Sequence, residues 1–261
     1  MKTLIPIKNF ERPEQRSVHH WPLRKFMMWA GALAIFSGVA VCVDTDVTRF
    51  CREGDLSGDL RRIVSLSEIF AHGFGIFICG SLIWTIAPQL RKFIPRFLCI
   101  AMLPGLAVNL FKMSVVRRRP SYYKRDFAEL VSDTWLGFDL GNAEYLTQSF
   151  PSAHTATAFG LALGLSWLIP RGKVMFFAFA ILSSFQRIMA GSHWLSDVFA
   201  GAVIAFVVGG LLFQNFGLGH LLYRLENRKI GSGELGSKGA EEQDINKLSP
   251  LRSQNAFSKT A

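Results

Sequence analysis

The stretch Phe150-Pro151-Ser152-Ala153-His154 opens an apolar run that extends from about residue 155 to residue 169. Two other polar clusters, residues 112–120 and 187–197, also lie at the ends of apolar runs. Together the three clusters hold two histidines, one aspartate and several cations. Ionisable side chains at membrane depth are costly unless they pair or line a wet cavity. The sequence therefore predicts a functional site where the three clusters meet.

The composition is typical of a membrane protein. Half of the 261 residues are apolar and only 18% are charged, and the apolar residues occur in blocks rather than in alternation. The formal charge of +10 fits basic flanks near anionic lipid headgroups. Nucleic-acid binding is disfavoured, because the basic residues separate hydrophobic blocks instead of forming one patch.

The four cysteines indicate neither a metal site nor a redox motif. Three of them fall inside predicted spans, where cysteine behaves as a small hydrophobic residue, and there is no CxxC. A disulfide between Cys42 and Cys51 is left as an alternative. The first apolar block begins near Phe26 without a small-residue cleavage site, so we expect no cleavable signal peptide.

The apolar blocks predict an all-α integral membrane protein with six transmembrane helices. The predicted spans are residues 26–43, 69–87, 97–111, 155–169, 174–190 and 193–216.

Charge bias predicts the orientation of these spans. The short loops 88–96 and 170–173 together hold five Lys/Arg and no acid, which is typical of the cytoplasmic side. Both termini are then cytoplasmic, with a basic segment at residues 1–25, a membrane domain at 26–216 and a polar tail without fixed structure at 217–261. All three polar clusters fall on the outer face. We therefore expect a multi-pass protein of a cell inner (cytoplasmic) membrane whose site faces outward.

The first cluster offers cations for an anionic group. If the helix continues through residues 112–119, Lys112 and Arg119 lie on one face, about two turns apart, and Pro120 ends the helix. Such a pair can hold a phosphate, Arg through a bidentate fork and Lys as a point charge. Arg117 and Arg118 are interpreted as side chains that extend to the headgroup level.

The second cluster resembles a helix N-terminus. Ser152 stands where an N-cap is expected, and the amides of Ala153 and His154 would then be free to bind phosphate oxygens. An ordinary structural cap is the alternative. His72, in the second span, is interpreted as a packed or headgroup-level histidine.

The third cluster pairs a histidine with an aspartate. His193 and Asp197 are four residues apart, so on a helix the carboxylate can orient one ring nitrogen and leave the other free to attack. A structural or metal-binding pair is the alternative, but the nearby cations repel metal ions. His154 remains as a proton donor to a leaving group.

These residues resemble the three-part signature KxxxxxxRP, PSGH and SRxxxxxHxxxD of the type 2 phosphatidic acid phosphatase (PAP2) superfamily. Residues 112–120 fit the first part in full. The second part is fitted with Ala153 in place of Gly, and the third with Gln186 in place of Ser. The resemblance covers about residues 112–197 together with the six-helix layout.

The resemblance implies a role for each matching residue. His193 is the nucleophile that forms a phosphohistidine, Asp197 orients it, and His154 protonates the leaving group. The phosphoryl group is bound by Lys112, Arg119, Ser152 and Arg187, with help from the Ala153 amide. Neither a metal nor a cofactor is implied.

The resemblance also implies a phosphorylated membrane lipid as substrate. Bacterial members act on lipid A, undecaprenyl diphosphate, phosphatidylglycerol phosphate or phosphatidic acid, and a lipid A phosphatase-like activity is our preferred expectation. The same site would serve a phosphotransferase that passes the phosphoryl group to a lipid acceptor. A transporter or scaffold that retains an inactive site is the non-enzymatic alternative.

Overall fold

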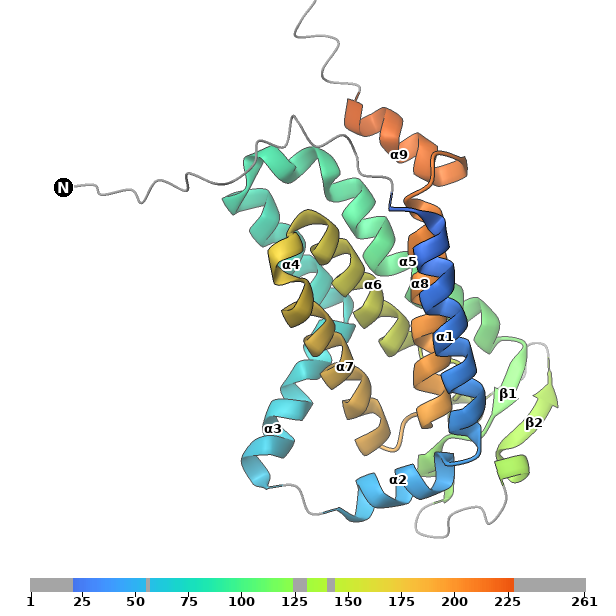
Figure 1. Cartoon of the computed structure of the whole chain (residues 1–261). Helices are drawn as coiled ribbons and strands as arrows, with labels where there is room; N and C mark the ends of the chain where they lie inside the picture. The colour runs from blue at the N-terminus through green and yellow to red at the C-terminus, as the bar shows by residue number, and fades with distance from the viewer. Residues whose placement is uncertain (1–20, 55–56, 124–130, 140–143, 228–261) are drawn as a thin grey trace, which may run out of the picture. The chain divides into compact units, whose positions relative to one another are not determined.

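The computed structural model describes residues 21–54, 57–123, 131–139 and 144–227 (Figure 1). The basic segment predicted at the N-terminus lies outside the described residues up to residue 20, and so does the tail from residue 228. The chain divides into two compact units, Met1–Asn215 and Phe216–Ala261. All the candidate site residues belong to the first unit. The tail, predicted to have no fixed structure from residue 217, begins with a helix.

The described elements are mostly helical. The α-helices are α1 (Leu23–Val41), α2 (Asp44–Glu53), α3 (Gly58–Leu66), α4 (Gly73–Ile86), α5 (Ile94–Lys112), α6 (Ala153–Leu168), α7 (Lys173–Met189), α8 (Leu195–Leu212) and α9 (Gly217–Asn227). The 3-10 helix η2 (Ser67–Ala71) joins α3 to α4, and η3 (Pro88–Phe93) leads into α5.

Each of the six predicted spans overlaps one long helix, namely α1, α4, α5, α6, α7 or α8. Four described segments are long and apolar enough to cross a membrane: Leu23–Val41, Pro88–Lys112, Pro170–Met189 and Leu195–Leu212. The pair Gly58–Ala71 and Gly73–Ile86, bent by 72°, can form a fifth span. At 16 residues, α6 is shorter than a usual span. The helical membrane fold is thus confirmed, while the number six stays a prediction.

Helix α6 lies inside the first unit and packs against α5, α7 and α8 (Figure 1). Small residues allow its close approach to α5. A side chain at Gly160 would not fit, because an added Cβ would lie 2.6 Å from the Ile100 carbonyl oxygen. Phe97 and Leu161 are fully buried in the hydrophobic core between α4, α5, α6 and α7. This close packing fixes the N-terminus of α6, where the second polar cluster lies.

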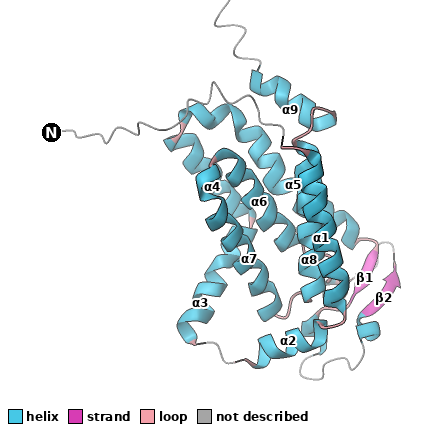
Figure 2. Cartoon of the chain, viewed as in Figure 1, coloured by secondary structure: helices cyan, strands magenta, loops and turns pink. Residues whose placement is uncertain are grey.

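Two segments predicted as loops contain regular structure (Figure 2). The short helices α2 and α3 occupy the loop after α1, and β1 (Val115–Arg117) pairs antiparallel with β2 (Trp135–Phe138) in the loop after α5. The helix of the third span therefore does not continue to Arg119, which was the condition for Lys112 and Arg119 to lie on one helical face. It ends at Lys112, and the β-branched pair Val115-Val116 enters a strand, which is the conformation such residues favour.

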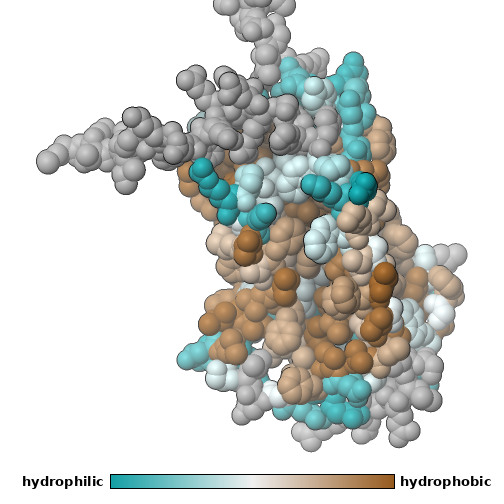
Figure 3. Space-filling model, in the orientation of Figure 1, coloured by the Kyte–Doolittle hydropathy of each residue, from teal (hydrophilic) through white to brown (hydrophobic). Residues whose placement is uncertain are grey.

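The surface follows the expected membrane pattern. Figure 3 shows hydrophobic residues over much of the side of the helices, with polar residues gathered near α2 and α3 at one end. Exposed apolar side chains such as Phe36, Phe77 and Leu106 suit contact with lipid. All four cysteines are free thiols, so the alternative disulfide between Cys42 and Cys51 is absent.

Candidate active site

Ser152 caps the N-terminus of α6, as the sequence predicted. Its side-chain oxygen accepts a hydrogen bond from the Thr155 backbone N–H at 3.3 Å. Its own backbone N–H donates to the carbonyl oxygen of Asp197 at 3.0 Å, which joins the starts of α6 and α8. Ala153 and His154 form the half-buried first turn of α6, where backbone N–H groups have no helical partner. This turn is suited to an anion.

A tight turn after α7 places His193 just before α8. Gly191 adopts a left-handed conformation with φ of +63°, which favours glycine at the end of a helix. The backbone N–H groups of Ser192 and His193 then donate to the Arg187 carbonyl oxygen at 3.0 and 3.3 Å. His193 therefore precedes the helix instead of starting it. Its Nδ1 still lies 3.7 Å from Oδ2 of Asp197.

The His193 ring is held by a backbone carbonyl. Its Nδ1–H donates to the Ser149 carbonyl oxygen at 2.7 Å, and the side chain is only 1% exposed. A carbonyl can only accept, so this bond places the proton on Nδ1 and leaves a lone pair on Nε2. The sequence predicted that Asp197 would orient the ring, whereas the shorter contact is made by Ser149.

Asp197 is fully buried and bonded on several sides. Its carboxylate accepts hydrogen bonds from the Ser149 hydroxyl and from the Trp194 backbone N–H, the latter at 2.9 Å. It also pairs with the Arg117 guanidinium. A carboxylate held this way stays ionised and rigid beside the His193 ring.

Arg117 is a site residue that sequence reasoning missed. The interpretation that it extends to the headgroup level is wrong, because its side chain is fully buried. Besides Asp197 it pairs with Asp44 at 2.7 Å, and its guanidinium lies 4.3 Å from the Trp135 ring centre. Burial raises the pKa of Asp44 above its ordinary value, and Arg117 opposes that shift. The signal in the sequence that could have identified Asp44 was its position directly after the first predicted span.

Three further cations surround the histidines. Lys112, Arg119 and Arg187 are each 7–8% exposed. They come from the end of α5, the segment after β1 and the last turn of α7. The Nε of Arg119 is buried and has no hydrogen-bond partner among the described residues. A buried donor without an acceptor is costly, so it suits an anionic ligand.

Burial and the neighbouring charges shift the pKa values of the site residues. Burial lowers the pKa of His193 from its ordinary 6.5 to about 4, the nearby Lys112 and Arg119 add to this shift, and Asp197 opposes it. Burial also lowers the pKa of Arg119, with Arg187 acting in the same direction. A site crowded with buried positive charge favours a neutral His193 and attracts a phosphate.

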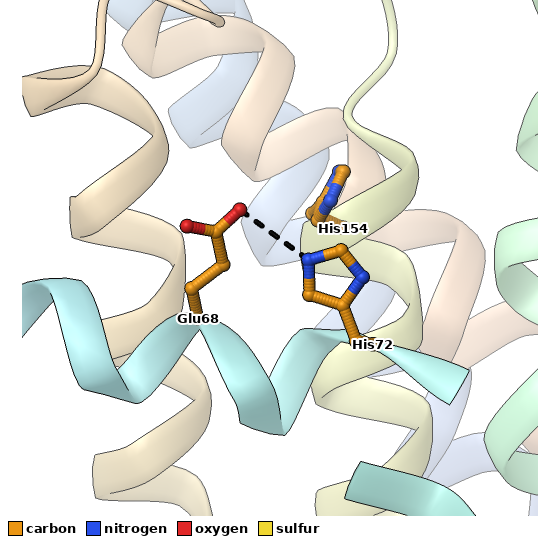
Figure 4. Close-up of side chains that lie close together, drawn as sticks. All are labelled: Glu68, His72 and His154. Atoms are coloured by element: carbon orange, nitrogen blue, oxygen red, sulfur yellow. Dashed lines mark hydrogen bonds and ion pairs between the residues drawn. The ribbon is translucent and has the colours of Figure 1, made fainter. Parts of the chain in front are cut away.

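Glu68 contributes a carboxylate that the sequence did not single out (Figure 4). Its Oε1 lies 2.7 Å from Nη2 of Arg187 and 3.3 Å from Nε2 of His72. The side-chain amide of Gln186 donates to its other oxygen at 3.1 Å. The His72 ring meets the His154 ring edge to face, with centroids 4.8 Å apart. His72 is thus close to the site and is not only a packed residue.

Glu68, His72 and His154 are the described residues that could hold a metal ion. Their ligand atoms lie within 4.8 Å of one another. Oε1 of Glu68 is already paired with Arg187, and a cation there would meet that guanidinium. These three residues therefore fit a resident divalent ion poorly.

Comparison with protein families matches residues 93–218 to the PAP2 superfamily. The match includes every residue that the sequence analysis assigned to the site.

Three curated relatives have informative names. Lipid A 1-phosphatases of Rhizobium johnstonii and Rhizobium etli are 32% and 33% identical over 120 residues, which cover 42% of this chain and 46% and 49% of the relatives. The undecaprenyl-diphosphatase BcrC of Bacillus subtilis is 37% identical over 68 residues, covering 25% of this chain and 34% of BcrC. The chain therefore matches less than half the length of each of these relatives.

Among solved structures, the crystal structure of LpxE from Aquifex aeolicus aligns with a TM-score of 0.49 and 23% identity. The alignment covers 67% of this chain and 96% of that one.

Proposed function

Because residues 93–218 belong to the PAP2 superfamily, we propose that the protein is a membrane lipid phosphatase that acts through a phosphohistidine. One observation carries this proposal most. His193 is buried among cations with its proton held on Nδ1 by Ser149, so Nε2 is left as a nucleophile.

In the first step, Nε2 of His193 attacks the phosphorus atom of the lipid phosphate. A nitrogen–phosphorus bond forms while the bond to the lipid oxygen breaks, and that oxygen takes a proton from His154. Asp197 stabilises the positive charge that develops on the His193 ring, because its carboxylate lies 3.7 Å from Nδ1. Arg117 in turn holds Asp197 in place.

In the second step, water attacks the phosphohistidine. His154, now neutral, accepts a proton from this water, and inorganic phosphate leaves with the original His193 restored. Lys112, Arg119 and Arg187 hold the phosphoryl oxygens through both steps, and the Ser152 side chain and Ala153 amide help at the start of α6. No step requires a metal ion or a cofactor.

We propose lipid A as the preferred substrate class, since two relatives are named lipid A 1-phosphatases. Undecaprenyl diphosphate is the second candidate, favoured by the match to BcrC. A phosphatidylglycerol phosphate phosphatase and a phosphotransferase that passes the phosphoryl group to a lipid acceptor use the same chemistry.

The proposed topology has six spans, with α6 as the short central one and both termini in the cytoplasm. The membrane domain is residues 26–216, flanked by the basic segment 1–25 and the polar tail 217–261. The loops 88–96 and 170–173 support this orientation through their positive charge. The site then faces outward from a cell inner membrane.

The direct test is single-turnover release of inorganic phosphate by the purified protein. Lipid A, undecaprenyl diphosphate and phosphatidylglycerol phosphate are compared, each with and without an added lipid acceptor. We expect the fastest release from lipid A, unchanged in EDTA and inhibited by vanadate, which mimics a phosphoryl group in transfer. Activity that is lost in EDTA and restored by a divalent ion would contradict the mechanism, and acceptor-dependent transfer would identify a phosphotransferase.

The pH dependence of kcat/KM should report the lowered pKa of His193. Below its pKa the ring is protonated and cannot attack, so activity falls on the acid side. Because the pKa is about 4 and not 6.5, we expect this fall near pH 4, once the substrate's own ionisation is subtracted. Removing the positive charge of Arg119 in Arg119→Gln should move the fall to higher pH. A fall centred at pH 6.5 or above in the unmodified protein is the contrary result.

A further inference from the structure

An apolar groove is lined by residues of α1 and just before its start and by residues of α6, α7 and α8. Its volume is about 690 Å³, within the usual range for ligand pockets. Aromatic side chains form much of its wall, namely Phe26, Trp29, Phe159, Phe177, Phe199 and Phe206. None of the residues assigned to the active site lines it. The groove is therefore a separate feature of the membrane-facing surface.

One end of the groove is positively charged. Lys25 and Lys173 line it there, both in the first turns of their helices, α1 and α7. Both side chains are exposed, and neither pairs with a carboxylate among the described residues. A helix dipole disfavours a cation in the first turn, and neither first turn contains an acid. These lysines therefore contribute little to the stability of the fold.

The charged end lies away from the active site along the helices. Lys173 precedes Arg187 by 14 residues of α7, a rise of roughly 21 Å. In the proposed orientation the lysines stand at the cytoplasmic headgroup level. An apolar groove of this kind suits an acyl chain, and the lysines suit a negative headgroup.

We infer that this groove binds an anionic glycerophospholipid, with its phosphate headgroup at Lys25 and Lys173 and one acyl chain along the aromatic wall. The charge of the lysines favours such a lipid over a zwitterionic one. The separation from His193 makes the lipid a bound partner and not a substrate. The inference depends on the membrane fold but not on the proposed phosphatase activity.

Native mass spectrometry of the detergent-solubilised full chain tests the site. The protein is titrated with phosphatidylglycerol and, separately, with phosphatidylcholine of the same acyl chains. We expect phosphatidylglycerol to bind at least about tenfold more tightly, and the double variant Lys25→Gln/Lys173→Gln to remove most of that preference. Ile181→Trp, which adds bulk inside the groove, should weaken binding of both lipids.

A matched control removes two other basic residues, the exposed Arg91 and the half-buried Lys92 of η3, which do not line the groove. Arg91→Gln/Lys92→Gln changes the net charge by the same amount and should leave the lipid preference unchanged. Equal binding of the two lipids by the unmodified protein would overturn the inference, and so would an equal loss in the control variant. Unchanged binding in Ile181→Trp would do the same. Thermal unfolding of each variant excludes misfolding as the cause of any loss.

Discussion

Replacing His193 by alanine is expected to lower the rate of phosphate release by at least about 10⁴-fold, because the attacking nitrogen is lost. The loss should be equal for lipid substrates and for p-nitrophenyl phosphate, since both need the same nucleophile. An acid-labile phosphoenzyme, trapped from the unmodified protein with ³²P-labelled lipid, should be absent from the variant.

The variant His154→Ala tests the role of the proton donor independently of the role of the nucleophile. A lipid alkoxide leaves poorly without a proton, so we expect a loss of about 10²–10⁴-fold with lipid substrates. p-Nitrophenol leaves readily as an anion, so its release should fall much less. His220→Ala, in α9, serves as the control histidine and should keep full activity. Equal losses with both substrates in His154→Ala would contradict its assignment as the acid.

The second large effect is expected at Arg117. Its removal in Arg117→Ala leaves Asp44 and Asp197 buried without their shared cation. Breaking a buried ion pair in this way costs about 3–5 kcal/mol in the free energy of unfolding. We expect a large fall in the temperature of unfolding in detergent, together with loss of activity, because Asp197 is no longer held beside His193.

A double-mutant cycle shows whether the loss comes from the buried charges. Asp44→Asn in the Arg117→Ala background removes one uncompensated carboxylate and should restore part of the stability. Arg118→Ala is the matched control, since the side chain of that neighbour is half-buried, stacks on Tyr122, and hydrogen-bonds to Tyr123 and to the Asp133 carbonyl oxygen. Its change in stability should stay within about 1 kcal/mol. Equal losses of stability in the two arginine variants would contradict the assignment of Arg117 as the cation that holds Asp44 and Asp197.

Much of the helical layout could be predicted from the sequence, because apolar blocks of span length and a serine before an apolar run are local signals. The Ser152 cap is the clearest example. The sequence did not show in the same way whether the third helix continues beyond the predicted span, which ends at residue 111. Pro120 suggested an end after Arg119, whereas pairing between β1 and β2 draws the chain out of the helix after Lys112.

The residues that support the site depend on long-range contacts. Arg117 stands among three consecutive arginines, and nothing local separates it from Arg118. Only the folded chain shows that it meets Asp44, 73 residues earlier, and Asp197, 80 residues later. Glu68 likewise reaches Gln186 across 118 residues. Single-sequence patterns with periods of two or 3.6 residues cannot report contacts of this range.

The positions of Asp44 and Glu68 limit how far this protein can be shortened from its N-terminal side. Both acids precede residue 93, where the family match begins, yet each is bonded to an arginine inside the matched region. A fragment trimmed to residues 93–218 would strip Arg117 of one carboxylate and Arg187 of its acidic neighbour. Shortening the chain from its N-terminal side therefore disturbs the chemistry well before it reaches residue 93, where the family match begins.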